Sequence, residues 1–327
     1  MQGFGKAGKE GVLVKGSTYL DAITKANAIV LDKTGTITEG NFEVIKVISA
    51  EEIEEKELLE IATKAESMSN HPIAKSIVNK VNKNINKEEV SEYSEIAGMG
   101  IKVKCKEDEI LVGNPKLLDS EKIKYYPCNE IGAIVYVAKN KKYLGAIVIS
   151  DVIKADSKDA IENLKKNGIN EIYMLTGDNN KIADSVANDV GIENVYSNLL
   201  PNEKVEKMKE IKDKNGVTIA VGDGINDSPL LALADIGISI GNTGSDLAIE
   251  TSDMVIMDGK LSSLNKLIKT SKITKRIVMQ NIYFAIGIKA LVLILGAIGI
   301  STMWEAVFAD VGVTFITVLN TLRIFRK

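Results

Sequence analysis

Three short apolar runs along the chain each end in a small cluster of polar residues. The runs and the clusters that follow them are Ala28–Leu31 with Asp32, Ile172–Leu175 with Thr176-Gly177-Asp178, and Val217–Val221 with Gly222-Asp223-Gly224. Continuous runs of this length that are rich in branched residues are typical of buried parallel strands. Helical patterns separate the runs, at residues 155–167, 181–190, 203–213 and 227–234. This alternation predicts an α/β fold with a doubly wound parallel sheet.

The pattern changes between Thr38 and Asp151. Two helical segments are expected there, followed by segments with the alternation of strands. The helices are expected at residues 51–67 and 73–83, and the strands at residues 100–106, 109–113, 132–138 and 143–149. We therefore expect an α+β domain at residues 40–149, inserted between the two parts of the doubly wound domain, residues 1–39 and 150–262. Because both connections lie near polar clusters, the insert is expected to hinge over the site.

The last part of the chain, residues 263–327, is expected to be a basic linker followed by two transmembrane helices. Ile282–Ile300 and Thr302–Leu322 are almost wholly apolar. Each is long enough to cross a bilayer, at about residues 280–300 and 303–323. Basic residues flank the pair on both outer sides, which predicts that both ends of this hairpin lie in the cytoplasm.

Composition and charge narrow the classes of function. The chain has 327 residues, of which 45% are hydrophobic, with a net charge of −3 and a pI of about 5.6. The sequence lacks the surplus of basic residues that favours nucleic-acid binding. Its two cysteines, Cys105 and Cys128, lie far apart, so we expect a reducing compartment and neither a disulfide framework nor a structural zinc site. Residues 1–15 do not have the apolar core of a signal peptide.

The polar clusters carry the residue types that phosphoryl transfer requires. Asp32 is followed by a turn with a glycine, where backbone amides can approach a phosphate closely. Its carboxylate is a candidate nucleophile toward the γ-phosphate of ATP. Asp223 and Asp227 offer oxygen ligands for the divalent cation that this transfer needs, Thr176 can donate a hydrogen bond to the phosphoryl group, and Lys204 can neutralise it. Each fragment alone is compatible with an ordinary capped turn, but together at strand ends they favour one site.

The segments around these residues resemble the signature motifs of P-type ATPases, which have a haloacid-dehalogenase-like fold. The matching segments are Asp32-Lys33-Thr34-Gly35-Thr36, Thr176-Gly177-Asp178 and Gly222-Asp223-Gly224-Ile225-Asn226-Asp227. The resemblance covers nearly the whole chain and implies that Asp32 is the phosphorylated nucleophile. The catalytic residues that it implies are Asp32, Lys33, Thr34, Thr176, Gly177, Asp178, Lys204 and Asn226. The residues implied to bind Mg²⁺ are Asp32, Thr34 through its carbonyl, Asp223 and Asp227, the last of which also completes the phosphate site.

A motif in the inserted domain indicates one subfamily of the P-type ATPases. Ser69-Asn70-His71-Pro72-Ile73-Ala74 resembles a Ser-Glu-His-Pro-Leu-Ala motif of heavy-metal-transporting P-type ATPases, in which the histidine orients the adenine ring of ATP. The resemblance implies that His71, Glu66, Gly98 and Gly100 bind the nucleotide. Asn70 departs from the glutamate of the family motif, which we expect to change nucleotide affinity modestly without abolishing binding.

Two ionisable residues, Lys289 and Asp310, lie within the expected membrane spans. Such residues are costly in a bilayer and are functional by default, although a purely structural pair across the hairpin is the alternative. The surrounding sequence resembles the zinc-, cadmium- and lead-exporting branch, and the copper-branch motifs are absent. A carboxylate also suits Zn²⁺ or Cd²⁺ better than Cu⁺. We therefore expect Asp310 to ligate the transported metal and Lys289 to act as its counter-ion when the metal leaves.

Several segments that P-type ATPases of this family contain are absent from this sequence. They are the earlier membrane helices with their Cys-Pro-Cys motif, the actuator domain, and an amino-terminal metal-binding domain. We expect the carboxyl-terminal part of a plasma-membrane, multi-pass pump with cytoplasmic catalytic domains, from a truncated gene or one half of a split protein. Such a chain is expected to be phosphorylated and to dephosphorylate slowly. Three alternatives remain: a copper or cobalt pump, an inactive nucleotide-binding remnant, and a membrane-anchored phosphatase, which needs an acid at the position of Thr34.

Overall fold

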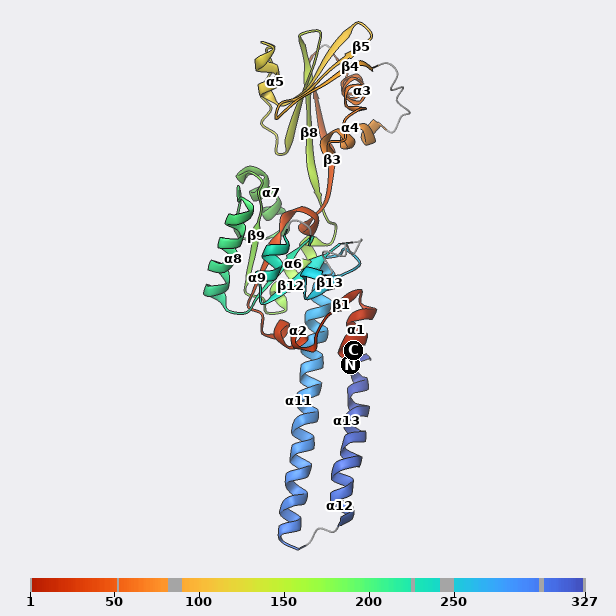
Figure 1. Cartoon of the computed structure of the whole chain (residues 1–327), viewed down its shortest axis with the longest axis vertical. Helices are drawn as coiled ribbons and strands as arrows, with labels where there is room; N and C mark the ends of the chain where they lie inside the picture. The colour runs from red at the N-terminus through yellow and green to blue at the C-terminus, as the bar shows by residue number, and fades with distance from the viewer. Residues whose placement is uncertain are drawn as a thin grey trace. The chain divides into compact units, whose positions relative to one another are not determined.

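The computed structural model describes residues 2–51, 53–81, 90–224, 227–241, 250–299 and 303–325. The chain forms two compact units (Figure 1), one made of Met1–Ile37 with Lys154–Lys327 and the other of Thr38–Ile153. An inserted unit was expected at residues 40–149. The two crossings between the units therefore lie two and four residues outside the expected boundaries.

The first unit is built on a seven-stranded sheet with the strand order β1-β13-β12-β11-β2-β9-β10. Its strands are β1 (Val12–Val14), β2 (Ala28–Asp32), β9 (Glu171–Leu175), β10 (Asn194–Tyr196), β11 (Thr218–Gly222), β12 (Ile236–Ile240) and β13 (Met254–Ile256). All neighbouring strands are parallel except the β1–β13 pair. The predicted doubly wound sheet is thus confirmed, with one antiparallel edge strand.

The central strands are covered on both faces, which explains why their sequences are continuously apolar. Every residue of β2, β11 and β12 is buried. Helices α8 (Pro201–Asn215) and α9 (Ser228–Leu233) pack on one face, where Met208 and Ile211 meet Val30 and Ala220. Helices α6 (Ser157–Lys166) and α7 (Asn180–Val190) complete the α/β layers. All four helices predicted between the strands are confirmed.

The inserted unit contains a six-stranded antiparallel sheet with the order β3-β8-β7-β6-β5-β4. Its strands are β3 (Thr38–Ser49), β4 (Val90–Ile96), β5 (Gly100–Cys105), β6 (Asp108–Gly113), β7 (Ala133–Lys139) and β8 (Lys142–Ile153). Helices α3 (Glu55–Glu66) and α4 (Pro72–Val81) form one hydrophobic core with this sheet. Helix α5 (Pro115–Ser120) forms a second hydrophobic core with the same sheet. The α+β insert is confirmed, whereas β3, β4 and α5 were not predicted.

The membrane part differs from the prediction at its start. Residues 263–279 were expected to be a linker, but they are the first half of one long helix, α11 (Ser262–Ala297). Leu264, Leu267 and Ile268 on this half are fully buried, and α11 contacts α1 (Gln2–Lys9) and α6. The helix continues into an apolar half (Figure 1).

The return segment is not one uniform helix. It consists of α12 (Met303–Val307), the π-helical turn η4 (Phe308–Gly312), α13 (Val313–Thr321) and the short helix η5 (Leu322–Phe325). By length and composition, α11 and the segment Phe308–Phe325 are candidate membrane spans, because each contains an 18-residue stretch with a high mean hydropathy, 1.9 in α11 and 1.4 in Phe308–Phe325.

Candidate active site

The three polar clusters meet at one edge of the first sheet, because β2 lies between β11 and β9. Asp32, the last residue of β2, is level with Leu175 of β9, which immediately precedes Thr176. Leu31 is level with Val221 of β11, two residues before Asp223. The carboxyl ends of neighbouring parallel strands therefore place Asp32, Thr176 and Asp223 side by side.

Asp32 is buried at the start of a tight loop, Lys33–Ile37. Only 5% of its surface is exposed, and the backbone N–H of Thr34 donates to its Oδ2 at 2.9 Å. Thr34 is extended and Gly35 takes a left-handed φ of 73°, so this segment turns sharply rather than forming a helix. A Cβ on Gly35 would lie 3.4 Å from the Cβ of Asp223. The glycine thus lets the loop pass close to the second carboxylate.

Lys204 joins two carboxylates of the site. Its Nζ lies 2.5 Å from Oδ1 of Asp32 and 3.3 Å from Oδ1 of Asp227. The lysine sits in the first turn of α8, which begins at Pro201 and is capped by the Glu203 carboxylate, an acceptor for the N–H of Leu200 at 2.7 Å. This capped start holds the lysine at the strand ends.

Burial and clustered negative charge shift the pKa values in the site. Burial and then the charge of Asp227 raise the pKa of Asp32 to about 7, against the opposing pull of Lys204. Burial likewise raises the pKa of Asp227. Burial alone would lower the pKa of Lys204, but the two carboxylates outweigh it and raise that pKa. Two carboxylates share one ammonium group here and Asp223 adds further negative charge, so an added cation would stabilise their ionised forms.

The donors present fit a magnesium ion. Within the described parts of the chain, no three His, Cys, Asp or Glu side chains converge as a complete metal site. Magnesium typically uses one or two carboxylates and fills its remaining positions with carbonyl, phosphate and water oxygens. Asp32, Asp223 and the carbonyl of Thr34 offer that kind of set.

Thr176 and Asp178 form a second network beside the first. The hydroxyl of Thr176 donates to Oδ2 of Asp178 at 2.8 Å, and the N–H of Asp178 donates back to that hydroxyl at 3.1 Å. Lys33, almost fully buried, lies 2.7 Å from the same Oδ2. Gly177, between Thr176 and Asp178, passes close to the carbonyl of Leu199: a Cβ on Gly177 would lie 3.3 Å from that oxygen. Lys33 therefore ties the loop Lys33–Ile37, which we call the nucleophile loop after its predicted role, to the end of β9.

Two further residues belong to this site but were not predicted. A Cβ on Gly222 would lie 2.7 Å from both Cβ and Oδ2 of Asp227, so only glycine leaves room for that carboxylate. The hydroxyl of Thr36 is buried and has no hydrogen-bond partner among the described residues. Both residues occur in the quoted motifs, but only the packing reveals their roles. Asn226, a predicted catalytic residue, lies outside the described residues.

The predicted nucleotide residues lie in the inserted unit. Glu66 ends α3 and is 6% exposed, and its carboxyl group makes no hydrogen bond or ion pair with the described residues. Burial and then the charge of Glu95 raise its pKa to about 7. His71 is exposed just before α4, and its Nδ1 accepts from the N–H of Ile73 at 3.3 Å. This bond leaves Nε2 of the neutral ring as the donor.

The two predicted glycines differ in their surroundings. Gly98 has a φ of 70° and open space where a side chain would be, and its carbonyl accepts from Nδ2 of Asn114 at 2.8 Å. A Cβ on Gly100 would lie 2.3 Å from the carbonyl oxygen of Val112. Gly100 is therefore required by the packing of β5 on β6, whereas Gly98 leaves room for a ligand.

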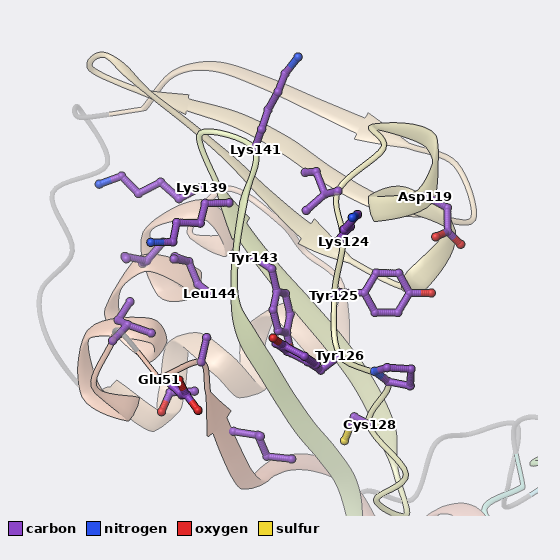
Figure 2. Close-up of a pocket in the computed structure, with 18 of the residues that line it drawn as sticks. Glu51, Asp119, Lys124, Tyr125, Tyr126, Cys128, Lys139, Lys141, Tyr143 and Leu144 are labelled. Atoms are coloured by element: carbon purple, nitrogen blue, oxygen red, sulfur yellow. The ribbon is translucent and has the colours of Figure 1, made fainter.

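A cavity of about 1760 Å³ lies elsewhere in the inserted unit. The rings of Tyr126 and Tyr143 line it side by side, with their centroids 6.1 Å apart, and its lining also includes Lys124, Lys139 and Lys141 (Figure 2). None of the predicted nucleotide residues lines it. Because Glu57 and Ile61 line this cavity and Glu66 ends the same helix, the predicted nucleotide residues lie toward the other end of α3.

The two ionisable residues of the membrane part form an ion pair. Nζ of Lys289 on α11 lies 2.9 Å from Oδ1 of Asp310. Asp310 is in the π-helical turn Phe308–Gly312, and the hydroxyl of Thr314 donates to its carbonyl at 2.6 Å. Single π-helical turns are frequent at functional sites, and this one brings the carboxylate to face α11.

Comparison with known proteins agrees with this geometry. Residues 26–235 match the haloacid dehalogenase-like hydrolase family. The chain is 47% identical to a "Cadmium, zinc and cobalt-transporting ATPase" of Bacillus subtilis, over 99% of this chain and 47% of that protein. It is 46% identical to a "Zinc-transporting ATPase" of Synechocystis, over 98% of this chain and 45% of that protein. The chain thus spans about half the length of the curated relatives it matches.

Solved structures show the same relationship. A zinc-transporting PIB-type ATPase in its E2.Pi state matches with a TM-score of 0.86 and 30% identity, over 98% of this chain and 53% of that one. The catalytic domain of the CPx-ATPase CopB-B matches with a TM-score of 0.66 and 30% identity, over 81% of this chain and 98% of that domain. The chain therefore belongs to the haloacid dehalogenase-like hydrolases and, within them, to the heavy-metal-transporting P-type ATPases.

Proposed function

We propose that this chain provides the phosphorylation and nucleotide-binding parts, with two membrane helices, of a pump that exports a divalent heavy metal. The contact of Lys204 with both Asp32 and Asp227 carries the catalytic part of the proposal. It gathers a buried nucleophile, a cation and further carboxylates at the strand ends. An arrangement of this kind suits transfer of a phosphoryl group to a carboxylate.

In the proposed reaction, a carboxylate oxygen of Asp32 attacks the γ-phosphorus of ATP. A new oxygen–phosphorus bond forms, the bond between that phosphorus and the bridging oxygen of ADP breaks, and ADP leaves with the electron pair. Lys204 offsets the negative charge at Asp32, and Thr176 donates to a phosphoryl oxygen. A bound Mg²⁺, held by Asp32, Asp223 and the Thr34 carbonyl, would neutralise phosphate charge.

The inserted unit supplies the nucleotide in this proposal. Glu66 is a buried carboxyl group without a partner among the described residues, and Gly98 borders open space. Nε2 of His71 is left as a donor by the bond at Nδ1. These residues suit contacts to the base of ATP, in agreement with the sequence resemblance.

The transported ion is proposed from the Lys289–Asp310 pair. A carboxylate that exchanges an ammonium partner for a metal suits a borderline divalent ion better than Cu⁺. The names of the relatives include zinc, cadmium and cobalt. Cobalt is therefore a candidate for the transported ion beside Zn²⁺ and Cd²⁺, and Pb²⁺ is a candidate only through the sequence resemblance. We place the pump in the plasma membrane, where the chain works with the further segments that full-length pumps contain.

The experiment that tests the catalytic proposal is phosphorylation of the whole chain in detergent by γ-labelled ATP and Mg²⁺. We expect an acid-stable label that hydroxylamine removes, and Asp32→Asn is expected to abolish it. Asp184→Asn, an exposed change on α7, is the matched control and should label normally. Absence of a hydroxylamine-sensitive label from the unsubstituted chain would refute the proposal.

A further inference from the structure

A short segment after the second connection, Lys154–Ser157, touches two elements that are far apart in the sequence. We call this segment the clasp. Lys154 is buried, with 8% of its surface exposed. Its Nζ donates to the carbonyl of Gly35 at 2.7 Å and to the carbonyl of Gly259 at 2.9 Å. One amino group therefore joins the nucleophile loop to the turn that precedes α11.

The clasp holds the nucleophile loop at several points. The N–H of Lys154 and the hydroxyl of Ser157 both donate to the carbonyl of Ile37, at 3.0 and 2.7 Å. The carbonyl of Gly35, the second acceptor on this loop, follows that of Thr34, the proposed Mg²⁺ ligand. A displacement of the Gly35 carbonyl would thus also move the proposed ligand, because the two carbonyls belong to adjacent rigid peptide units.

The clasp also holds the start of α11. Oδ2 of Asp156 accepts from the N–H of Ser262, the first residue of the helix, at 2.8 Å. One turn further on, Nδ2 of Asn265 donates to the carbonyl of Ala160 on α6 at 2.8 Å. The first turns of α11 are therefore fastened to the clasp and to the helix that follows it. The same helix carries Lys289 of the membrane ion pair.

A buried lysine is costly unless its donors are satisfied. Removing it would leave two inward-facing carbonyl oxygens without that donor. A buried acceptor that loses its donor costs more free energy than a hydrogen bond of which both partners are removed. Gly35 and Gly259 both have left-handed φ angles, 73° and 67°. The direction of each of these two carbonyl groups thus depends on a turn at a glycine. Because Lys154 binds both carbonyl groups, it fixes the position of one turn relative to the other.

We propose that Lys154 is a positioning residue that places the nucleophile loop and transmits its phosphorylation state to the start of α11. This inference rests on the proposed phosphorylation of Asp32. Lys154 does not touch the reacting atoms. It acts through Gly35 on the loop and through Gly259 on α11, while Asp156 serves only the α11 side.

The first test measures phosphorylation of the whole chain in detergent. Lys154→Met is expected to slow phosphoenzyme formation at saturating ATP by about 10- to 100-fold, the effect of a small displacement at a reacting site. The ATP concentration for half-saturation should not change, because the predicted nucleotide residues lie in the other unit. Lys154→Arg should restore most of the rate. The control, Lys158→Met, alters an exposed lysine on α6 and should behave as the unsubstituted chain.

The second test measures hydrogen exchange of the first turns of α11, with and without beryllium fluoride and Mg²⁺ as a phosphoryl mimic. The mimic should change exchange there in the unsubstituted chain and in Lys158→Met. Asp156→Ala should keep the normal phosphorylation rate but lose the change in hydrogen exchange at α11. A merely structural role of Asp156 would not separate these two effects. Should Lys154→Met fail to fold, Lys154→Arg and Asp156→Ala still decide the question.

Three results would overturn the inference: a normal rate in Lys154→Met, a normal exchange response in Asp156→Ala, or no response in an unsubstituted chain that is phosphorylated. If the unsubstituted chain forms no phosphoenzyme, the failure lies instead with the proposed function.

Discussion

The side-chain nitrogen of Lys204 lies 2.5 Å from Oδ1 of Asp32, although 172 positions separate the two residues in the chain. The sheet makes this contact possible, because β2 ends where α8 begins. The same nitrogen also reaches Oδ1 of Asp227 at 3.3 Å. A single cation thus balances the nucleophile and a buried carboxylate that would otherwise repel it.

Lys204→Met should therefore remove most of the phosphorylation activity. Without the cation, Asp32 and Asp227 repel each other and the incoming phosphate, and loss of one such group costs about 10²- to 10³-fold in rate. The measurement is the initial rate of hydroxylamine-sensitive labelling by ATP and Mg²⁺. Lys209→Met, an exposed change on the same helix, is the control. A rate within threefold of normal in Lys204→Met would show that the contact has no catalytic role.

Gly222→Ala should destabilise the site by steric conflict. The added Cβ would lie 2.7 Å from the Asp227 side chain, which Lys204 holds in place, and overpacking of this kind costs about 1–3 kcal/mol. We expect a lower free energy of unfolding in urea and slower phosphorylation. Gly8→Ala is the control, since nothing lies within 4 Å of its added Cβ. Equal stability of the two variants would contradict the close packing of Gly222 on Asp227.

The inserted unit should become less stable as the pH rises through the pKa of Glu66. Burial and the charge of Glu95 raise that pKa from 4.5 to about 7, so the folded unit favours the neutral acid. The stability is fully present below the unfolded pKa and is lost toward pH 7 and above. At one pKa unit per 1.36 kcal/mol, the loss is at most about 3 kcal/mol.

Glu66→Gln isolates this effect, because glutamine keeps the shape of the neutral acid and does not titrate. Relative to the unsubstituted chain, we expect it to gain stability between pH 5 and pH 8, measured by hydrogen exchange of α3 across that range. Glu57→Gln, an exposed change on the same helix, should follow the unsubstituted chain. Parallel pH curves for Glu66→Gln and the unsubstituted chain would exclude the pKa shift.

The Lys289–Asp310 pair predicts opposite effects of two substitutions on metal binding. Lys289 occupies a carboxylate oxygen of Asp310 that the proposed transported metal would need. Lys289→Met should therefore tighten Zn²⁺ binding by about tenfold or more, as expected from removing a nearby like charge at low dielectric, and Asp310→Asn should weaken it severely.

Zn²⁺ binding to the whole chain in detergent, measured by calorimetry or equilibrium dialysis, checks this prediction. Lys266→Met, an exposed change in the first half of the same helix, is the control. If both membrane substitutions left Zn²⁺ affinity unchanged, the pair would be a structural device only.

Periodicity predicted the strands β2, β9 and β11 of the first sheet but missed the buried inner strand β12, in which Gly237 and Ser239 interrupt the apolar run. Strands β2 and β11 are buried over their whole length, and β9 over all but its first residue, so continuous apolar runs identify them. Strands β1, β10 and β13 have three residues each, too few for a pattern to emerge. The long strand β3 escaped prediction because it is an edge strand with polar residues on one face.

The first half of α11 was mistaken for a linker because of its lysines. Lys266, Lys269 and Lys272 recur every third position, while Leu264, Leu267 and Ile268 are fully buried between them. This is the pattern of a half-buried helix, which the high local charge concealed. The distinction has a functional consequence, since a continuous helix connects the clasp to the membrane ion pair.

By itself, the sequence predicted which side chains the proposed chemistry uses, because the proposed nucleophile and its companions occur in motifs at the ends of recognisable strands. It also determined the α/β class, the insert and the apolar hairpin, since each leaves a local pattern. Only the tertiary structure decided which groups touch: Lys204 with Asp32, Gly222 with Asp227, and Lys154 with both the loop and α11. Those contacts join residues far apart in the chain, and local pattern carries no information about a distance that the packing of the sheet and its helices sets.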